Sequence, residues 1–343
     1  MNKKRILITL VVFAILCLLV YLQVRAWNNF EWKIFWQQTK HVNRLDIVAG
    51  IALTYAAYVL RAVRWRIFLK PVRETTTARL MAPQFIGFTA LALLGRAGEV
   101  VRPYIIAKKE NLTFTSQMAV WTVERIFDMG AFGLILAISF LSPEVRGLRH
   151  SEYYLGSGAV LVAIVLGMLI FAVVIRKWRD RVADLFHDLF ARFAPGFAQR
   201  LREKIHLFSV GLNTIGDSGS ALQLAGVSLV MWLLIVFAYR AVMNAYPDPV
   251  HNLSWVRIIL LMLASMAGSL LQLPGVGGGS QLATISVLTD FDIPHELAVS
   301  CGMLLWAVTF MSVIPAGLLL ARREHVSLRA VEEAEEKAAA LAQ

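Results

Sequence analysis

Long uninterrupted apolar runs dominate this sequence and decide what it can fold into. A helix needs about 20 apolar residues to cross the hydrocarbon core of a bilayer, which is about 30 Å thick. Six runs approach or exceed that length, at residues 6–22, 45–60, 114–141, 155–175, 221–243 and 296–321. They are continuous and do not alternate with a period of two, so they predict helices rather than barrel strands. The sequence therefore predicts an all-α polytopic membrane protein with six full transmembrane helices.

Composition agrees with this prediction and excludes other classes of protein. Hydrophobic residues make up 58% of the 343 residues and charged residues 17%, against about 25% charged residues in ordinary soluble domains. The net charge of +11 would suit a nucleic-acid-binding protein, but the basic residues flank apolar runs, so we expect no nucleic acid partner. The two cysteines lie in separate apolar runs and the seven histidines are scattered. We therefore expect no metal site, no cofactor and no catalytic residues.

Two further apolar runs are interrupted by glycine and predict re-entrant hairpins. Residues 80–94 are followed by Gly95-Arg96-Ala97-Gly98, and an apolar stretch resumes at 100–107. Residues 259–273 are followed by a Pro-Gly-Val-Gly-Gly-Gly sequence, and an apolar stretch resumes at 281–291. Fifteen helical residues span only about 22 Å, so each pair of stretches predicts a chain that enters the bilayer partway and turns back. The alternative is that one or both runs cross fully as kinked helices.

The distribution of Lys and Arg predicts the orientation of these segments. If the first hairpin opens to the cytoplasm and the second to the outside, 25 of the 34 basic residues lie on the cytoplasmic side. Both termini are then cytoplasmic. The units 45–141 and 221–321 have opposite orientations, an inverted repeat of the kind that places a substrate site near the membrane midplane. We expect a single transmembrane domain over 1–321 and a cytoplasmic helical tail over 322–343.

A basic amphipathic segment over residues 176–208 is predicted to lie outside the bilayer. Its apolar residues recur at helical spacing, and Arg and Asp fill the other face. Such a segment is typical of a helix at the cytoplasmic membrane surface, with its basic side on anionic headgroups. A packed cytoplasmic helical hairpin is the competing interpretation.

The first candidate site surrounds the glycines of the first hairpin. Arg96, Glu99 and Arg102 lie within seven residues at predicted membrane depth, where charge is costly unless it is paired or faces water. The returning half-helix begins near Gly98, and its free N–H groups would attract an anion. We predict that this segment binds a lipid phosphate. The alternative is a structural ion pair between Glu99 and Arg102.

The second candidate site lies within the apolar run 114–141. Glu124 and Asp128 share one helix face, and Arg125 can reach Asp128 at a spacing of three residues. Ionisable residues inside a span usually mark a functional site. We predict that these three residues line a polar path or relay protons, with a purely structural ion network as the alternative.

The third candidate site lies at the glycines of the second hairpin. Gly277 and Gly278 can take positive φ and expose backbone N–H groups to a substrate. Ser280 is predicted to cap the returning half-helix, with Gln281 beside it. A simple kink is the alternative.

A weaker feature is the basic run of Arg61, Arg64 and Arg66 beside Trp65. Runs of this kind usually anchor a helix at the membrane interface, and contact with lipid phosphate is the alternative.

Several of these motifs occur together, in a fixed order, in a known family. The chain resembles the lysylphosphatidylglycerol synthase transmembrane-region family, also called flippase-like or UPF0104 proteins, over about 45–321. The motifs are Arg61-Ala62-Val63-Arg64-Trp65, Gly95-Arg96-Ala97-Gly98-Glu99 with Arg102-Pro103, Glu124-Arg125-Ile126-Phe127-Asp128 and Leu273-Pro274-Gly275-Val276-Gly277. In fused members a soluble aminoacyl transfer domain follows, and the membrane region is thought to move the modified lipid. This chain resembles the stand-alone members. Its neutral Gly279-Ser280-Gln281 departs from the acidic residue of many members, which argues against a cationic headgroup there.

Residues and resemblance together lead to one expected function. We expect a lipid translocase of the cytoplasmic (inner) membrane, which moves a phospholipid or polyprenyl-phosphate-type lipid between leaflets. The partner is an anionic membrane lipid, and a lipid-synthesis enzyme or a second copy of the chain are further possible partners. The alternatives are a membrane-embedded lipid-modifying enzyme and a non-transporting partner of a lipid-synthesis enzyme.

Overall fold

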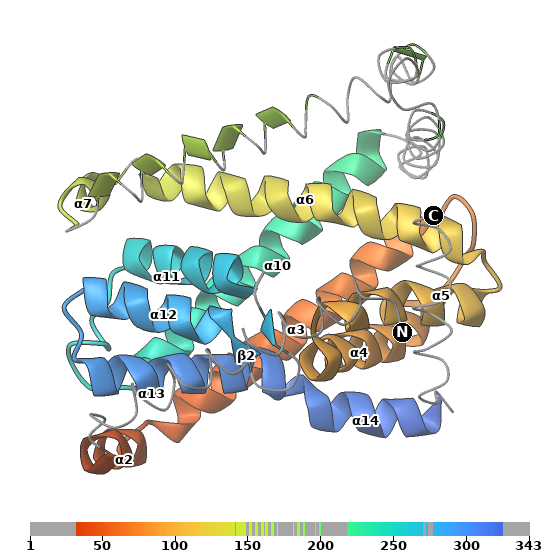
Figure 1. Ribbon diagram of the computed structural model, residues 1–343. Coiled ribbons are helices and arrows are strands. Elements are labelled where there is room, and N and C mark those ends of the chain that lie inside the picture. The colour runs from red at the N-terminus through yellow and green to blue at the C-terminus, as the bar shows by residue number, and fades with distance from the viewer. Residues whose placement is uncertain are drawn as a thin grey trace, which may run out of the picture.

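Figure 1 shows the computed structural model of the chain, whose described residues form helices apart from one short pair of strands. The structure describes residues 32–140, 142–148, 218–269, 272–273 and 277–324, and short pieces between 151 and 199. In chain order the elements are α2 (Trp32–Lys40), α3 (Arg44–Leu69), α4 (Thr77–Leu94), the 3₁₀ helix η1 (Gly95–Val100), α5 (Val101–Glu110), α6 (Phe114–Phe140), α7 (Pro143–Arg146), α10 (Ser218–Asn244), α11 (Trp255–Gly268), β1 (Gln272–Leu273), β2 (Gly277–Gly278), α12 (Gly279–Asp290), α13 (His295–Trp306), the π-helical turn η3 (Ala307–Met311) and α14 (Val313–Arg323).

The long helices agree with the predicted all-α membrane class. Four helical stretches among the described residues are long and apolar enough to cross a bilayer: Arg44–Leu69, Thr77–Leu94, Gly219–Asn244 and His295–Arg323. The helix α6 has 27 residues and carries the three ionisable residues of the second candidate site. The predicted spans 6–22 and 155–175, the segment 176–208 and the tail beyond residue 324 lie wholly or almost wholly outside the described residues.

The chain turns back after α4, as predicted for the first hairpin. Gly95 has φ 65°, a conformation that suits a residue without a Cβ, and η1 and α5 then pack along α4. The contact is close: a Cβ added at Gly98 would lie 2.3 Å from the carbonyl carbon of Ala90. Because α4 begins at Thr77, it is longer than predicted, and its 18 residues are enough for a crossing. The depth of this hairpin in a bilayer stays a prediction.

The second broken run also forms a helical hairpin, from α11 and α12. The strands β1 and β2 pair antiparallel at its tip, with Gln272 opposite Gly278 and Leu273 opposite Gly277. The two helices lie side by side. A Cβ added at Gly268 would lie 2.2 Å from the carbonyl oxygen of Gly279, so the two helices touch at their glycines.

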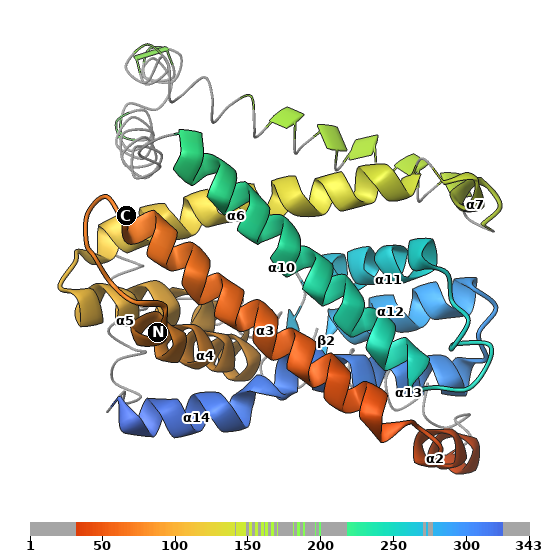
Figure 2. The ribbon, with the colours of Figure 1, turned by 180° about the vertical axis from the view of Figure 1, so that it is seen from behind.

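The tips of the two hairpins meet in the middle of the molecule, where β1 contacts η1. Figure 1 shows α4 and α5 extending to one side of this point and α11 and α12 to the other. Behind them, α3 and α10 pack against each other along their lengths, as Figure 2 shows. The two predicted glycine sites therefore lie near each other, although about 180 residues separate them in the sequence.

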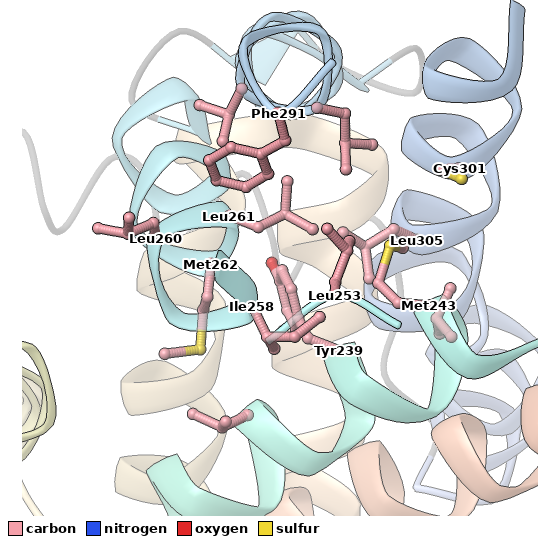
Figure 3. Close-up of a cluster of buried hydrophobic side chains, with 14 of the residues drawn as sticks. Tyr239, Met243, Leu253, Ile258, Leu260, Leu261, Met262, Phe291, Cys301 and Leu305 are labelled. Carbon is pink, nitrogen blue, oxygen red and sulfur yellow. The ribbon is translucent and has the colours of Figure 1, made fainter. Parts of the chain in front are cut away.

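The half of the molecule around the second hairpin is held together by apolar packing. Figure 3 shows Tyr239 and Met243 of α10, Ile258 and Leu261 of α11 and Leu305 of α13 pointing toward one another. All five are nearly or fully buried. Between helices within a bilayer, dense van der Waals packing rather than removal from water stabilises such contacts.

The last span is a single helical stretch that widens for one turn. Pro315 of α14 has no N–H to donate to Met311 four residues earlier. The preceding turn is π-helical, and Ser312 N donates to Ala307 O at 2.9 Å. Two side chains of α3 donate to carbonyls of this region, Tyr55 to Ser312 O at 2.6 Å and Tyr58 to Thr309 O at 3.3 Å. The widened turn is thereby fixed against α3.

Loops predicted to share a side of the membrane do lie together. At one end of the molecule Arg79 pairs with Glu110 at 3.2 Å, and Lys109 pairs with Glu324. At the other end Ser254 donates to Glu144 at 2.6 Å. Figure 1 shows α7 and the ends of α11 to α13 at the left, and α5 and the end of α14 at the right. The side on which each end lies stays a prediction.

This sidedness can be tested by labelling single cysteines in a chain whose Cys17 and Cys301 are replaced by alanine. We expect Arg146→Cys and His251→Cys to react with a membrane-impermeant maleimide in intact cells. Arg146 follows the predicted outer end of the span 114–141, and His251 follows that of the span 221–243. Lys108→Cys is expected to react only after the cells are opened. Outside labelling of Lys108→Cys would contradict the predicted orientation.

Candidate functional site

The helix α6 places two carboxylates in the interior of the half of the molecule that contains the first hairpin. Glu124 is fully buried and Asp128 is 5% exposed. They lie four residues apart, so one face of the helix directs both toward α3 and α5. A buried carboxylate is stable only when it is paired and hydrogen-bonded. The structure meets this requirement with arginines from three different elements.

Arg64 of α3 lies between the two carboxylates. It is fully buried, its Nη2 pairs with Glu124, and its Nη1 donates to Asp128 at 2.5 Å. It also donates to Ser228 Oγ of α10 at 3.0 Å. Trp232 of α10 donates to the same Asp128 oxygen at 3.2 Å. Arg64 therefore joins α3, α6 and α10 through charge-assisted hydrogen bonds.

Arg102 of α5 binds Glu124 with both of its terminal nitrogens. The distances are 3.1 Å to Oε1 and 2.6 Å to Oε2. Its Nη1 also donates to Gln84 of α4 at 3.1 Å. The guanidinium lies 4.7 Å from the ring centre of Trp65 and 5.3 Å from that of Phe88. This planar, stacked arrangement is specific to arginine.

Two more arginines complete the set, with looser contacts. Arg61 of α3 is 3.9 Å from Asp128 and stacks on Phe88 at 4.8 Å. Arg125 of α6 is 3.0 Å from Asp128 and 3.4 Å from Glu124. The side chain of Arg125 is 39% exposed, whereas that of Arg61 is 10% exposed. We call the six residues Arg61, Arg64, Arg102, Arg125, Glu124 and Asp128 the arginine–carboxylate cluster.

The arginine–carboxylate cluster carries more positive than negative charge. Four guanidinium groups face two carboxylates, which leaves an excess of two positive charges. Glu99, which lies nearby, reduces the excess to one among the described side chains, and the side chain of Arg96 is outside them. Uncompensated buried charge is unfavourable, so the arrangement attracts an anion.

A small pocket, with an enclosed volume of about 50 Å³, opens beside this cluster. The residues that line it are Gly87, Phe88 and Leu91 of α4, Glu99 of η1, Arg102 of α5, and Trp121 and Arg125 of α6. A Cβ added at Gly87 would lie 2.5 Å from Arg102 Cβ, so this glycine lets the arginine approach α4. The pocket thus combines two cations, one acid and an apolar wall between α4 and α6.

The glycines of the second hairpin form a backbone turn. Gly278 has φ 100° and is the N-cap of α12, and its N–H donates to Gln281 Oε1 at 3.1 Å. The prediction that Ser280 caps this helix is therefore wrong. The cap and the start of the helix lie two residues earlier than predicted, at Gly278 and Gly279, which puts Ser280 inside the first turn, where it is buried. Gly277 pairs with Leu273 in the short strands.

The structure brings together most of the residues predicted for the first two sites. Glu99, Arg102 and Arg125 line one pocket, and Arg102 joins Glu124. Arg125 reaches Asp128, as the helical spacing predicted. Gly98 allows η1 to pack closely against Ala90 of α4, and Arg96 belongs to η1. Whether any of them binds a lipid stays a prediction.

Two expectations about arginines are corrected. Arg61 and Arg64 are buried ion-pair partners, 8% and 0% exposed, rather than anchors at the membrane interface. The reason is that α3 continues for nine residues beyond the apolar run, to Leu69, so both arginines lie inside the packed helix. The alternative pairing of Arg102 with Glu99 gives way to the two-pronged contact with Glu124, which comes from a different helix.

Several residues of the site escaped the sequence analysis. Gln84 accepts from Arg102, and Ser228 and Trp232 contact the cluster from α10. Polar residues such as these, single within apolar runs, are common and carry no spacing signal. The one available signal was charge: two carboxylates in one span need cations from elsewhere, and Arg61 and Arg64 lie three residues apart on one helix face.

Comparison with known proteins gives matches along most of the chain. A family model described as "Lysylphosphatidylglycerol synthase TM region" matches residues 6–317. A UPF0104 membrane protein from Methanothermobacter thermautotrophicus is 23% identical over an alignment of 287 residues that covers 80% of this chain and 81% of that protein. Glycosyltransferase AglD from Haloferax volcanii is 26% identical over an alignment of 322 residues that covers 84% of this chain but 51% of that protein. No solved structure matches.

Proposed function

Because this chain belongs to the lysylphosphatidylglycerol synthase transmembrane-region family, we propose that it is a lipid translocase. It moves a lipid with an anionic phosphate headgroup, of the phospholipid or polyprenyl-phosphate type, between the leaflets of the cytoplasmic membrane. The observation that carries this proposal is the excess of positive charge in the arginine–carboxylate cluster, beside a pocket lined by Glu99, Arg102 and Arg125.

The geometry suits a headgroup better than a whole lipid. The enclosed volume of the pocket is about 50 Å³, far below the roughly 300–1,000 Å³ of sites that hold a drug-sized ligand, so it has room for part of a headgroup, whereas acyl or prenyl chains can stay in the surrounding bilayer. The phosphate gains charge-assisted contacts with guanidinium groups, and these replace the water that it loses at membrane depth. Holding the headgroup away from bulk lipid is the step that lowers the barrier to its crossing.

The sequence also bears on the energy source of the proposed transport. No Gly-x-x-x-x-Gly-Lys-Ser/Thr loop for ATP occurs in it, so the proposed transport is driven by the lipid gradient or by ions. The name of AglD describes a protein of which the matched part is 51%. We therefore assign no glycosyl transfer to the matched region.

Reconstitution in vesicles tests the proposal directly. The full chain is inserted into phosphatidylcholine vesicles that contain fluorescent phosphatidylglycerol in both leaflets, and dithionite is added outside. Empty vesicles lose only the label of the outer leaflet. We expect protein-containing vesicles to lose the inner label as well, because the protein carries it outward within the assay. Inner label that stays protected, with folded protein present, would contradict translocation of phosphatidylglycerol without an ion gradient.

The same vesicles separate transport from chemistry. Their lipids are extracted after incubation and resolved by thin-layer chromatography. We expect the phosphatidylglycerol to be unchanged, because the proposal moves the lipid without altering it. A new lipid product would instead favour the lipid-modifying enzyme.

A further inference from the structure

We propose that Arg125 is the arginine that binds the phosphate of the transported lipid. Its side chain leaves Asp128 to do so, while the side chains of Arg64 and Arg102 keep their partners. This inference rests on the proposed function and adds to it a division of roles among the arginines. It assigns the headgroup contact to the α6 arginine, rather than to Arg102 of the hairpin, for which the sequence had predicted it.

The carboxylates do not depend on Arg125. Glu124 is bound by Arg64 and by both terminal nitrogens of Arg102. Asp128 accepts from Arg64 and from Trp232, and Arg61 lies 3.9 Å from its second oxygen. When Arg125 moves away, each carboxylate keeps a charged partner. Its departure therefore leaves no buried charge unpaired, which is the condition for a low-cost exchange.

Arg64 and Arg102 cannot exchange in the same way. The side chain of Arg64 is fully buried and that of Arg102 is 5% exposed. Arg102 is also held between the rings of Trp65 and Phe88 and against Gly87. Moving it would break both of its contacts with Glu124 and the one with Gln84. These two arginines hold helices together, and the fold fixes their geometry.

Arg125 has the position that a ligand-binding arginine needs. Its side chain is 39% exposed, lies over the ring of Trp121 at 5.6 Å and lines the pocket. Its Nε is buried and donates to no partner among the described residues. Once the guanidinium leaves Asp128, its Nε and a terminal nitrogen can bind a phosphate with two parallel hydrogen bonds.

Glu99 opposes this binding from the same pocket and so favours release. It interacts electrostatically with Arg125 and lines the pocket with it. A carboxylate near a phosphate repels it, and the repulsion is strong where little water screens it. We therefore expect Glu99 to weaken the binding of an anionic headgroup, and its neutral counterpart Gln to strengthen it.

A binding measurement tests this assignment apart from transport. The purified full chain is titrated with phosphatidylglycerol in detergent, and the bound fraction is measured by native mass spectrometry. Loss of one charge-assisted contact weakens affinity by about tenfold to a hundredfold. We expect such a loss for Arg125→Gln, a smaller one for Arg125→Lys, and tighter binding for Glu99→Gln. Folding is followed by thermal melting, and we expect Arg125→Gln to melt like the wild type.

Arg257 supplies a matched control. It too is a partly exposed arginine, 35%, paired with a carboxylate (Glu144, 3.3 Å) and stacked on an aromatic ring (Phe291, 5.3 Å), but it lies in the second half. We expect Arg257→Gln to bind phosphatidylglycerol as the wild type does. An equal loss in both variants would overturn the assignment, because a general effect of surface charge would then explain it.

The remaining outcomes are also decisive. A folded Arg125→Gln with wild-type affinity overturns the inference, and so does an Arg125→Gln that no longer folds, since Arg125 would then be structural. Displacement of the lipid by an equal concentration of inorganic phosphate would make the soluble ion the ligand and overturn the lipid assignment.

Two outcomes separate the inference from the proposed function. Binding that depends on Arg125, without transport by the wild type, leaves the inference standing and contradicts the proposed function. If Arg125→Gln binds the lipid with wild-type affinity and still transports it, the inference is overturned and the proposed function stands.

Discussion

Glu124→Gln is expected to destabilise the protein by about 3–5 kcal/mol, the usual consequence of removing one partner of a buried ion pair. The substitution keeps the size of the side chain but leaves Arg64, Arg102 and Arg125 with Asp128 as their only carboxylate in the cluster. The packing of α5 on α6 depends most on this residue, because Arg102 binds Glu124 with both terminal nitrogens. Unfolding by SDS in mixed micelles, followed by circular dichroism, measures the change.

Two further variants make this result specific. Glu144→Gln removes a carboxylate that is 32% exposed and paired with Arg257, and we expect a loss of at most about 1 kcal/mol. Arg102→Gln combined with Glu124→Gln removes both partners, so it should be more stable than Glu124→Gln alone. A Glu124→Gln variant as stable as Glu144→Gln would show that the buried cluster does not hold α3, α5 and α6 together.

Gly98→Ala and Gly268→Ala are each expected to cost about 3 kcal/mol, the upper end of the range for overpacking. In both cases the added methyl group would meet backbone atoms, which cannot move aside as a side chain can. The new Cβ would lie 2.3 Å from the carbonyl of Ala90 in one hairpin and 2.2 Å from that of Gly279 in the other. The helices of each hairpin must therefore separate. Thermal melting in detergent and the yield of monodisperse protein measure the loss.

Glycines in open surroundings give the opposite sign. Gly130 in α6 and Gly226 in α10 have no atom within 4 Å of the position of an added Cβ, apart from their own helix backbone and chain neighbours. Replacing either with alanine should stabilise its helix by about 0.5–1 kcal/mol, because alanine has the higher helix propensity. Equal melting temperatures for all four variants would show that the hairpins are not closed by glycine contacts.

The sequence was sufficient to predict the long helices among the described residues and the two reversals of the chain. Apolar length located the helices at 44–69, 114–140, 218–244 and 295–323 to within a few residues at most ends. Glycine located the turns, because Gly95 and Gly278 take backbone conformations that other residues rarely adopt. Both signals are local. The boundary of α3 was missed by nine residues because its last turns carry arginines, which read as interface residues when their partners are unknown.

The composition of the site could be predicted only in part, because most of its contacts join distant segments. The pairing of Arg125 with Asp128 follows from helical spacing. The pairings of Arg64 and Arg102 with Glu124 join residues 60 and 22 positions apart, and no helical period connects them. Ser280 was wrongly predicted as a cap because the hairpin turn has φ 100° at Gly278, which starts the helix earlier.

The distribution of charge between α3 and α6 has a consequence for how the chain is made. The ribosome completes Arg61 and Arg64 well before Glu124 and Asp128, since 60 residues separate Arg64 from Glu124. An arginine at the centre of a newly inserted helix costs about 2.5–3.5 kcal/mol, and less toward its end. Arg61 and Arg64 lie in the last third of α3, and their carboxylate partners on α6 are made later. We therefore expect stable insertion of α3 to depend on α6, so that the two helices enter the membrane as a pair.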